Sequence, residues 1–249
     1  MDAIGKAAPF SLFISDLHLC PSRPAITTQF LEFLKLTAPS AESLYILGDF
    51  FEYWAGDDDL YDETHASIIS GLKTLSQRQT KLYFMHGNRD FLLGQKFAEV
   101  TGIELLSDPV VLDCYGKRIL LTHGDMFCTD DTPYQEFRRQ VRNPDWQNSF
   151  LQQPLIIRKA QIEALRKQSE TAKSTKAESI MDVNPDAVAA MIREHQFPEL
   201  LIHGHTHRPA KHMLEIDGHH CERWVLGDWY EQGSYLILDE NGCHSINNG

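Results

Sequence analysis

Residues 12–18 read LFISDLH, a short apolar run that ends in an Asp-x-His pair. Similar runs end in polar residues further along the chain, in LYILGD (44–49), LYFMHGNRD (82–90), ILLTHGD (119–125) and LLIHGHTH (200–207). Apolar runs of this length, rich in aromatic and branched side chains, are typical of buried β-strands. The five runs therefore predict five strands, each followed directly by polar side chains.

Helical patterns lie between the early strands. Residues 28–36 and 64–75 carry apolar side chains at helical spacing. This alternation of strand and helix predicts an α/β layered fold. The later runs at residues 224–226 and 235–238 are predicted to form a second sheet or its edge.

The stretch from about residue 132 to residue 195 has a different character. It is rich in helix formers, with breaks at Pro144, Pro154 and Pro185. Residues 134–176 contain nine Lys or Arg and four Asp or Glu, in a chain whose formal charge is −12. We predict a single domain over residues 1–249, with a basic helical insertion, or lid, at about 132–195. An ordinary solvated helical surface is the alternative.

Composition excludes several classes of protein. The N-terminal stretch lacks a basic region and is broken by Asp16, so we expect neither a signal peptide nor a transit peptide. We find no apolar run long enough to cross a bilayer. The five cysteines are odd in number and form no C-x-x-C pair, which favours reduced thiols in the cytoplasm. The acidic charge also argues against nucleic-acid binding.

The polar residues after the five strands are those that bind metal ions. Open α/β sheets hold ligands just beyond the carboxyl ends of their strands, where loops distant in sequence converge. Carboxylate, amide and imidazole groups together suit Mn, Fe or Zn better than Ca. The candidate ligands are Asp16, His18, Asp49, Asn88, His123, His205 and His207.

Each of these motifs is weak when it is taken alone. An Asp-x-His pair is usually a surface turn, Gly-Asn is a favoured hairpin dipeptide, and a lone histidine after a strand is usually a core residue. The metal interpretation depends on finding all five motifs in one chain, each at the end of an apolar run.

The order D-x-H, G-D, G-N, H-G and G-H-T-H resembles that of the calcineurin-like metallophosphoesterases, and the likeness covers the chain apart from the insertion. It implies a double β-sheet sandwich flanked by helices and two divalent metal ions about 3.5–4 Å apart that activate a water. Asp16, His18 and His207 would hold one ion, and Asn88, His123 and His205 the other. Asp49 would bridge both.

The third motif departs from the common family pattern. Many members have a histidine, a proposed general acid, where this chain has Arg89. Arginine stays protonated, so it is a poor proton donor but a good phosphate clamp. A phosphate leaving group, with a second pKa of about 6, needs no proton. We therefore predict a pyrophosphate substrate. An ion pair between Arg89 and Asp90 or a nearby acid is the alternative.

GDFFEYWAGD (48–57), GNRDF (87–91) and IMDVN (180–184) most resemble the branch of this family that acts in lipid A synthesis. That likeness implies hydrolysis of UDP-2,3-diacylglucosamine to UMP and 2,3-diacylglucosamine 1-phosphate, with manganese. It also implies a cytoplasmic enzyme, peripheral on the anionic inner-membrane surface, and we expect a monomer. An apolar stripe in the insertion (Trp146, Phe150, Leu151, Leu155 and Ile156) could cover acyl chains, or simply pack on the core.

The same resemblance assigns roles to individual residues. Asp49, Asn88, Arg89 and His123 would act in catalysis. The implied substrate contacts are Asn88, Arg89, Asp131, Ser169, Lys173, Lys176 and His205. Lys173 stands where related sequences can carry a neutral residue, and Asp131 could instead begin a helix. Asp125 and His203 could orient ligand histidines, whereas residues 57–59 are expected to form a solvated loop.

Two other functions remain open at this stage. One is a phosphodiesterase or phosphatase of the same fold that acts on nucleotides or phosphoproteins. The other is a binding scaffold without catalysis, which the seven ligand-capable side chains disfavour.

Overall fold

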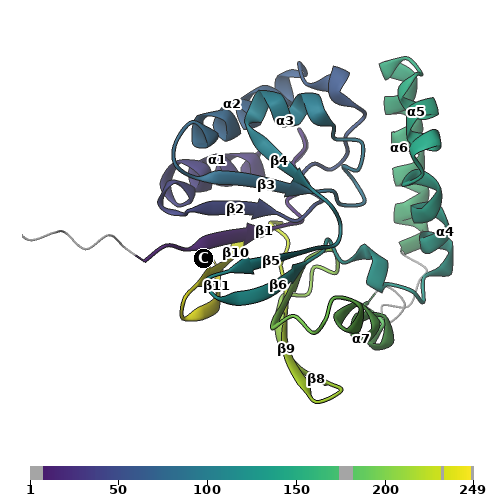
Figure 1. The fold of residues 1–249 in the computed structure, drawn as a ribbon. Coiled ribbons are helices and arrows are strands. Elements are labelled where there is room, and N and C mark those ends of the chain that lie inside the picture. Colours follow the sequence, from purple (N-terminus) through teal and green to yellow (C-terminus); the bar gives the residue numbers. More distant parts are fainter. Residues whose placement is uncertain (1–7, 174–181, 231–232, 248–249) are drawn as a thin grey trace, which may run out of the picture.

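The structure is a computed structural model that describes residues 8–173, 182–230 and 233–247, with the side chains of 168–173 and 247 outside that description. Its strands form two sheets (Figure 1). The first has the order β11-β10-β1-β2-β3-β4. Strands β1 (Ser11–Ile14), β2 (Ser43–Ile46), β3 (Lys81–Met85) and β4 (Ile103–Leu106) are parallel. Strand β10 (Ser234–Asp239) is antiparallel to β1, and β11 (Gly242–Asn247) to β10.

The second sheet has the order β5-β6-β7-β9-β8. Its central strands β6 (Lys117–Leu121), β7 (Leu200–His203) and β9 (His219–Val225) are parallel. Its edges β5 (Val110–Cys114) and β8 (Ala210–Ile216) are antiparallel to their neighbours. All five strands predicted from the polar endings are therefore parallel strands, three in one sheet and two in the other.

Alternating side chains explain how the layers pack. Leu12 and Ile14 on β1 face helices α1 (Pro24–Leu36), α2 (Glu63–Ser76) and α3 (Gln95–Thr101), whereas Phe13 lies in the core between the sheets. On the far side, α7 (Pro185–Glu194) packs Val188 and Ile192 against the second sheet. A helix–sheet–sheet–helix order results, and this confirms the predicted double-sheet sandwich flanked by helices.

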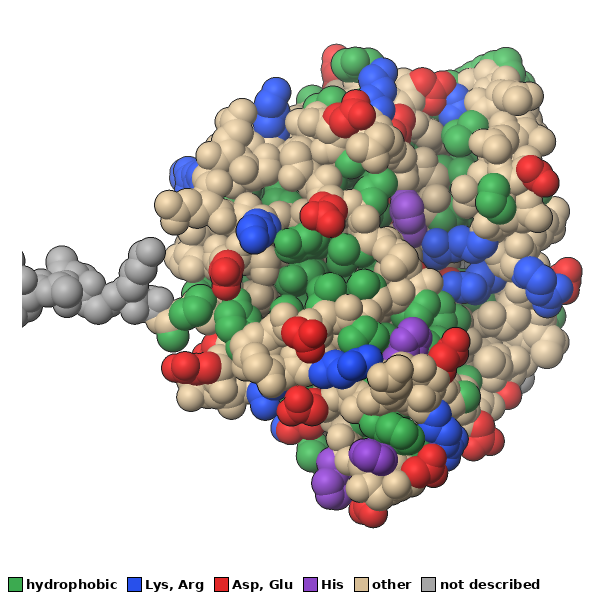
Figure 2. Space-filling view, in the orientation of Figure 1, with side chains coloured by type: hydrophobic (Ala, Val, Ile, Leu, Met, Phe, Trp, Pro, Cys, Tyr) green, Lys and Arg blue, Asp and Glu red, His purple; other side chains and the backbone are tan. Residues whose placement is uncertain are grey.

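Helices α4 (Thr132–Val141), α5 (Pro144–Leu151) and α6 (Leu155–Lys173) stand beside the sandwich, at the end where the parallel strands terminate (Figure 1). Short 3₁₀ turns occur at η1 (Ala38–Ser40), η2 (Asp57–Asp59) and η3 (Asp125–Phe127). In the space-filling view, Lys and Arg side chains gather along the seam between these helices and the sandwich (Figure 2). No helix in the described part of the chain has the length and apolar character to cross a membrane.

One local expectation was wrong. Residues 57–59 are not a solvated loop, because each aspartate holds another part of the structure. Asp57 accepts backbone N–H groups of Gly94 and Phe97, at 2.9 and 3.1 Å. Asp58 pairs with Arg158, and buried Asp59 pairs with Lys159. In the apolar stripe of the insertion, Trp146 and Phe150 pack on the core, which is one of the two alternatives left open, whereas Leu151 and Ile156 are exposed.

Candidate metal centre

The loops after the five strands meet because backbone hydrogen bonds join them. Asp16 N–H donates to the carbonyl of Gly48 at 3.1 Å, and His18 N–H donates to the carbonyl of Asp49 at 2.9 Å. The two sheets are linked in the same way, since His205 N–H donates to Asp16 Oδ2 at 2.9 Å. These bonds bring three of the five segments together at one end of the sandwich.

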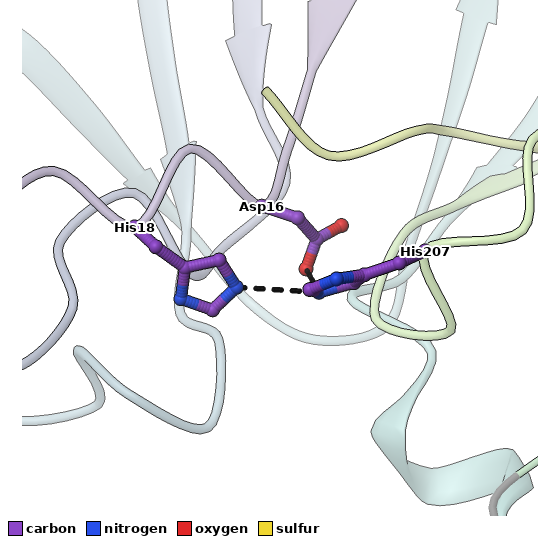
Figure 3. Close-up of side chains that lie close together, drawn as sticks. All are labelled: Asp16, His18 and His207. Atoms are coloured by element: carbon purple, nitrogen blue, oxygen red, sulfur yellow. Dashed lines mark hydrogen bonds and ion pairs between the residues drawn. The ribbon is translucent and has the colours of Figure 1, made fainter. Parts of the chain in front are cut away.

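The first group consists of Asp16, His18 and His207, whose side chains point toward one another (Figure 3). His18 Nε2 lies 3.2 Å from His207 Nε2, and His207 Nε2 lies 3.4 Å from Asp16 Oδ1. Asp16 Oδ1 is buried and accepts no hydrogen bond from the described residues. One carboxylate oxygen and two imidazole nitrogens thus face a common point, which is an arrangement that fits a divalent cation.

The second group consists of Asp49, His123 and His205, with Asn88 beside it. Asn88 Oδ1 lies 3.0 Å from His123 Nε2. The opposite nitrogen of His123 lies 2.8 Å from the carbonyl oxygen of Leu47, which fixes the orientation of the ring. Carbonyl partners of this kind are typical of histidines that bind metals.

Asp49 lies between the two groups. Its Oδ1 is 3.7 Å from His123 Nε2, and its Oδ2 is 3.8 Å from His18 Nε2. Burial is the largest influence on this carboxyl group and raises its pKa. One buried carboxylate with an oxygen toward each group is the arrangement expected of a shared ligand.

The backbone of the site is unusual. Asp16, His18, Asp49, His205 and His207 all have positive φ angles, between 49° and 69°. Such angles are uncommon for residues other than glycine, and they persist only where the surrounding structure holds them. Five of the seven predicted ligands therefore have a constrained backbone.

Two glycines make the close approach of the loops possible. A Cβ on Gly87 would collide with the backbone and carboxylate of Asp49, and a Cβ on Gly48 would collide with Gly87 and the ring of His123. Gly48 also has φ +87°. The Gly-Asp and Gly-Asn motifs thus need glycine to bring the β2 and β3 loops together.

The histidines differ in charge because their surroundings differ. Burial lowers the pKa of His205 to about 3 and that of His18 well below its usual range, which leaves both rings neutral. Burial acts in the same direction on His123, but the charges of Asp49 and Asp125 outweigh it and raise the pKa to about 8. Neutral imidazole is the form that binds metal ions.

A cavity of about 560 Å³ opens beside these groups. Asn88, Arg89, Asp131 and His205 line it, as do Trp146 and Phe150 from the insertion. Of the other expected substrate contacts, Lys176 lies outside the described residues, and so do the side chains of Ser169 and Lys173. The cavity is of the size usual for small-molecule sites, with apolar walls and a few convergent polar groups.

Some polar residues have different partners from those expected. Among the described residues, the carboxylate of Asp125 accepts side-chain hydrogen bonds from Tyr134 and Arg138 of α4, at 2.8 and 2.9 Å, and not from a candidate ligand histidine. Asp131 caps α4 by accepting the N–H of Tyr134 at 3.2 Å, the alternative left open by the sequence, and also lines the cavity.

The ion pair that the sequence left open as an alternative for Arg89 forms with a nearby acid, and not with Asp90. The carboxylate of Asp90 is bound by backbone N–H groups at Gly87, Phe50 and Phe51. Arg89 instead faces Glu52, with 3.9 Å between Nη1 and Oε1.

Sequence reasoning missed several residues of the cavity wall, among them the polar residues Glu52, Tyr134 and Arg166. Tyr134 stacks on His205 with 5.9 Å between ring centroids. Arg166 Nη2 lies 3.0 Å from Glu52 Oε1, although the two residues are distant in sequence. Of these three residues, only Glu52 lies in a motif noted in the sequence, GDFFEYWAGD (48–57).

Comparisons with known proteins agree with this arrangement. Residues 11–209 match the model of the calcineurin-like phosphoesterase family. A UDP-2,3-diacylglucosamine hydrolase of Aromatoleum aromaticum is 53% identical over 232 residues, covering 93% of this chain and 94% of that protein. A protein of the same name from Cellvibrio japonicus is 52% identical, covering 93% and 96% of the two chains.

A solved archaeal phosphodiesterase aligns with a TM-score of 0.45 at 13% identity, covering 96% of this chain and 99% of its own. The match to the family model, together with relatives that are more than 50% identical to this chain, identifies the family. The chain belongs to the calcineurin-like phosphoesterase family.

Proposed function

We propose that this chain hydrolyses the pyrophosphate bond of UDP-2,3-diacylglucosamine and releases UMP and 2,3-diacylglucosamine 1-phosphate. The observation that carries the proposal is a cavity with two kinds of wall. Asn88, His205 and His207 of the candidate metal centre line it, together with the apolar side chains of Phe91, Trp146, Phe150 and Ile162. Relatives about half identical to this chain bear the name of that hydrolase.

Asp16, His18 and His207 would hold one divalent cation, and Asn88, His123 and His205 the other, with Asp49 shared. When bound, the two ions supply charge that polarises phosphoryl oxygens and lowers the pKa of water. We propose manganese as the native metal: the mixture of oxygen and imidazole donors suits manganese, iron or zinc, and the likeness to the lipid A branch of the family favours manganese among them. Metal analysis of protein purified without added metal tests this, and zinc or iron in place of manganese would contradict it.

The chain's own residues account for the choice of bond. Arg89 N–H donates to Asp49 Oδ1 at 2.8 Å, so the arginine is attached directly to the shared carboxylate. Its guanidinium carries a fixed positive charge beside the two groups and can bind phosphate oxygens. It offers no proton to a leaving group, which suits a phosphate leaving group and disfavours an alkoxide.

The substrate assay tests the proposal directly. Purified enzyme with manganese is given UDP-2,3-diacylglucosamine and, separately, bis(p-nitrophenyl) phosphate. We expect release of UMP from the first and little turnover of the second. Rapid turnover of the diester without UMP release would assign the chain to a different phosphodiesterase activity.

We also propose that the enzyme works in the cytoplasm as a monomer and contacts the anionic inner-membrane surface through the turn between α5 and α6. Leu151, Ile156 and Ile157 at this turn are 39%, 73% and 45% exposed. Exposed apolar side chains on a helical segment can enter a lipid interface.

Sedimentation with phosphatidylglycerol vesicles tests the membrane contact. The double variant Ile156→Ser/Ile157→Ser should bind several-fold less than the wild-type chain. Leu36→Ser is the matched control, because Leu36 is 72% exposed but belongs to α1. Equal binding by all three proteins would contradict the proposed surface.

A further inference from the structure

Glu52 is a buried carboxylate at the border between the metal centre and the cavity. Only 8% of its side chain is exposed, and it is surrounded by His18, Arg23, Arg89 and Arg166. Buried charges are retained where they have several partners, since an unpaired one is costly. Three guanidinium groups around one carboxylate leave a surplus of positive charge beside the cavity.

The two oxygens of Glu52 face different partners. Oε2 faces the metal centre: it pairs with Arg23 and lies 3.6 Å from His18 Nδ1. His18 Nδ1 is buried and has no hydrogen-bond partner among the described residues. Oε1 faces the cavity, with Arg89 Nη1 at 3.9 Å and Arg166 Nη2 at 3.0 Å.

The backbone holds Glu52 in this place. Its N–H donates to the carbonyl of Leu19 at 3.1 Å, next to the β-bridge between Leu19 and Phe51. Arg23 donates to the carbonyl of His18 at 3.2 Å, and its guanidinium lies over the ring of Tyr230 at 4.5 Å. The Oε2 side is therefore a fixed support, while the Oε1 side reaches toward groups that line the cavity.

The two cavity arginines come from different parts of the chain. Arg89 follows β3, and Arg166 lies on α6. Two like charges repel each other, and a shared carboxylate allows them to lie close together. With Glu52 in place, both guanidinium groups line the cavity beside the metal-ligand residues.

From this geometry we propose that Glu52 is a positioning residue that aims Arg89 and Arg166 at the substrate's pyrophosphate and orients His18 from behind. The assignment deepens the proposed function and rests on it for the nature of the substrate. The two negative charges of a pyrophosphate diester match the surplus left by three arginines around one carboxylate. Displacing a positioned group by about an ångström can reduce turnover on the order of a hundredfold.

Glu52→Gln keeps the size of the side chain and removes its charge. At saturating manganese and substrate, we expect kcat to fall about tenfold to a hundredfold, with KM changed less than about threefold. The apparent manganese affinity, measured by calorimetry without substrate, should fall at least about tenfold because His18 loses its support. If either quantity stays within twofold of the wild-type value, the proposal is wrong.

Glu163→Gln is the matched control. Glu163 also pairs with Arg166, at 3.4 Å, but its side chain is 51% exposed. This variant should keep wild-type kcat and manganese affinity. Glu163→Gln losing as much as Glu52→Gln would overturn the specific role of Glu52.

A double-mutant cycle distinguishes a positioning role of Glu52 from a purely structural one. In an Arg166→Gln background, Glu52→Gln should cost several-fold less in kcat than in the wild-type chain, because one of the groups that it positions is already absent. Fully additive losses would overturn the proposal. If Glu52→Gln does not fold, the single variant Arg166→Gln provides the test, and a wild-type kcat in that variant would overturn the proposal.

Failure of the proposed function has a different signature. In that case the wild-type chain releases no UMP from UDP-2,3-diacylglucosamine, whereas the manganese affinities can still be compared. Failure of the role of Glu52 appears as equal UMP release by wild type and variant.

Discussion

Asp49 is the residue on which the candidate centre depends most. One of its oxygens faces the ring of His123 in one group, and the other faces the ring of His18 in the other group. Its carboxylate accepts the N–H of Arg89, and its loop is held by hydrogen bonds from the β1 loop. The loss of this carboxylate should therefore affect both groups at once.

The variant Asp49→Ala tests this expectation. We expect it to retain fewer than one metal ion per chain after dialysis and to lose at least about a thousandfold in turnover, since one carboxylate would serve both ions. Metal analysis and the UMP assay measure the two effects. Asp113→Ala, at an exposed position on β5, is the control. Ordinary turnover in Asp49→Ala would contradict the assignment of the shared ligand.

The seven candidate ligands could be found from the sequence because each follows an apolar run. The contact between Glu52 and Arg166 could not be found, because it joins a loop to a helix far along the chain and no local pattern indicates it. Residues 57–59 were misjudged for a related reason: a run of acids usually lies in solvent, and its partners Arg158 and Lys159 become neighbours only when α6 packs.

At the level of elements, the motif-bearing strands and the early helices were predictable, and the edges of the sheets were not. Strands β1, β2, β3, β6 and β7 lie where the apolar runs are, and α5 and α7 begin at Pro144 and Pro185. Proline suits the first turn of a helix, so these breaks mark helix starts. Strands β4 and β8 are partly exposed, and charged side chains interrupt their apolar residues, so neither has a continuous apolar run.

Arg158 anchors α6 to the sandwich. Its side chain is only 2% exposed, and it donates to the carbonyl of Ala55, to that of Gln153 and to Asp58. Arg158→Ala should lower the free energy of unfolding by about 1–3 kcal/mol, because it leaves these acceptors unsatisfied.

Hydrogen exchange across α6 gives the local readout for that variant, and faster exchange is expected there than in β1 or β2. The control is Arg139→Ala in α4, whose side chain is 70% exposed and which should change stability by less than about 0.5 kcal/mol. Unchanged exchange in α6 would show that the helix is held by other contacts.

Helix α2 carries a group that links stability to pH. His65 packs against Phe51 and Trp54, with ring centroids 5.0 and 4.8 Å apart, and burial lowers its pKa below the ordinary 6.5. Below pH 6.5 the unfolded chain binds a proton that the folded chain excludes, so stability falls as the pH drops. In chemical denaturation between pH 7 and pH 5, His65→Gln should lose less stability than the wild-type chain; an equal or steeper loss would contradict this.

The whole molecule is a sandwich that brings strand ends from both sheets to one point. Neither sheet alone carries a complete group of candidate ligands: Asp16 and His18 follow β1 of the first sheet, while His207 follows β7 of the second. Asp49 and Asn88 likewise meet His123 and His205 across the sandwich. The fold class was predictable from the alternation of elements, but the meeting of the two sheets depends on packing that no single segment encodes.

A crystal structure of the manganese-loaded protein, with anomalous diffraction recorded at the manganese edge, tests the central claim most directly. We predict two anomalous peaks per chain, one among Asp16, His18 and His207 and one among Asn88, His123 and His205, with Asp49 bound to both. A single peak, or peaks away from these side chains, would contradict the account.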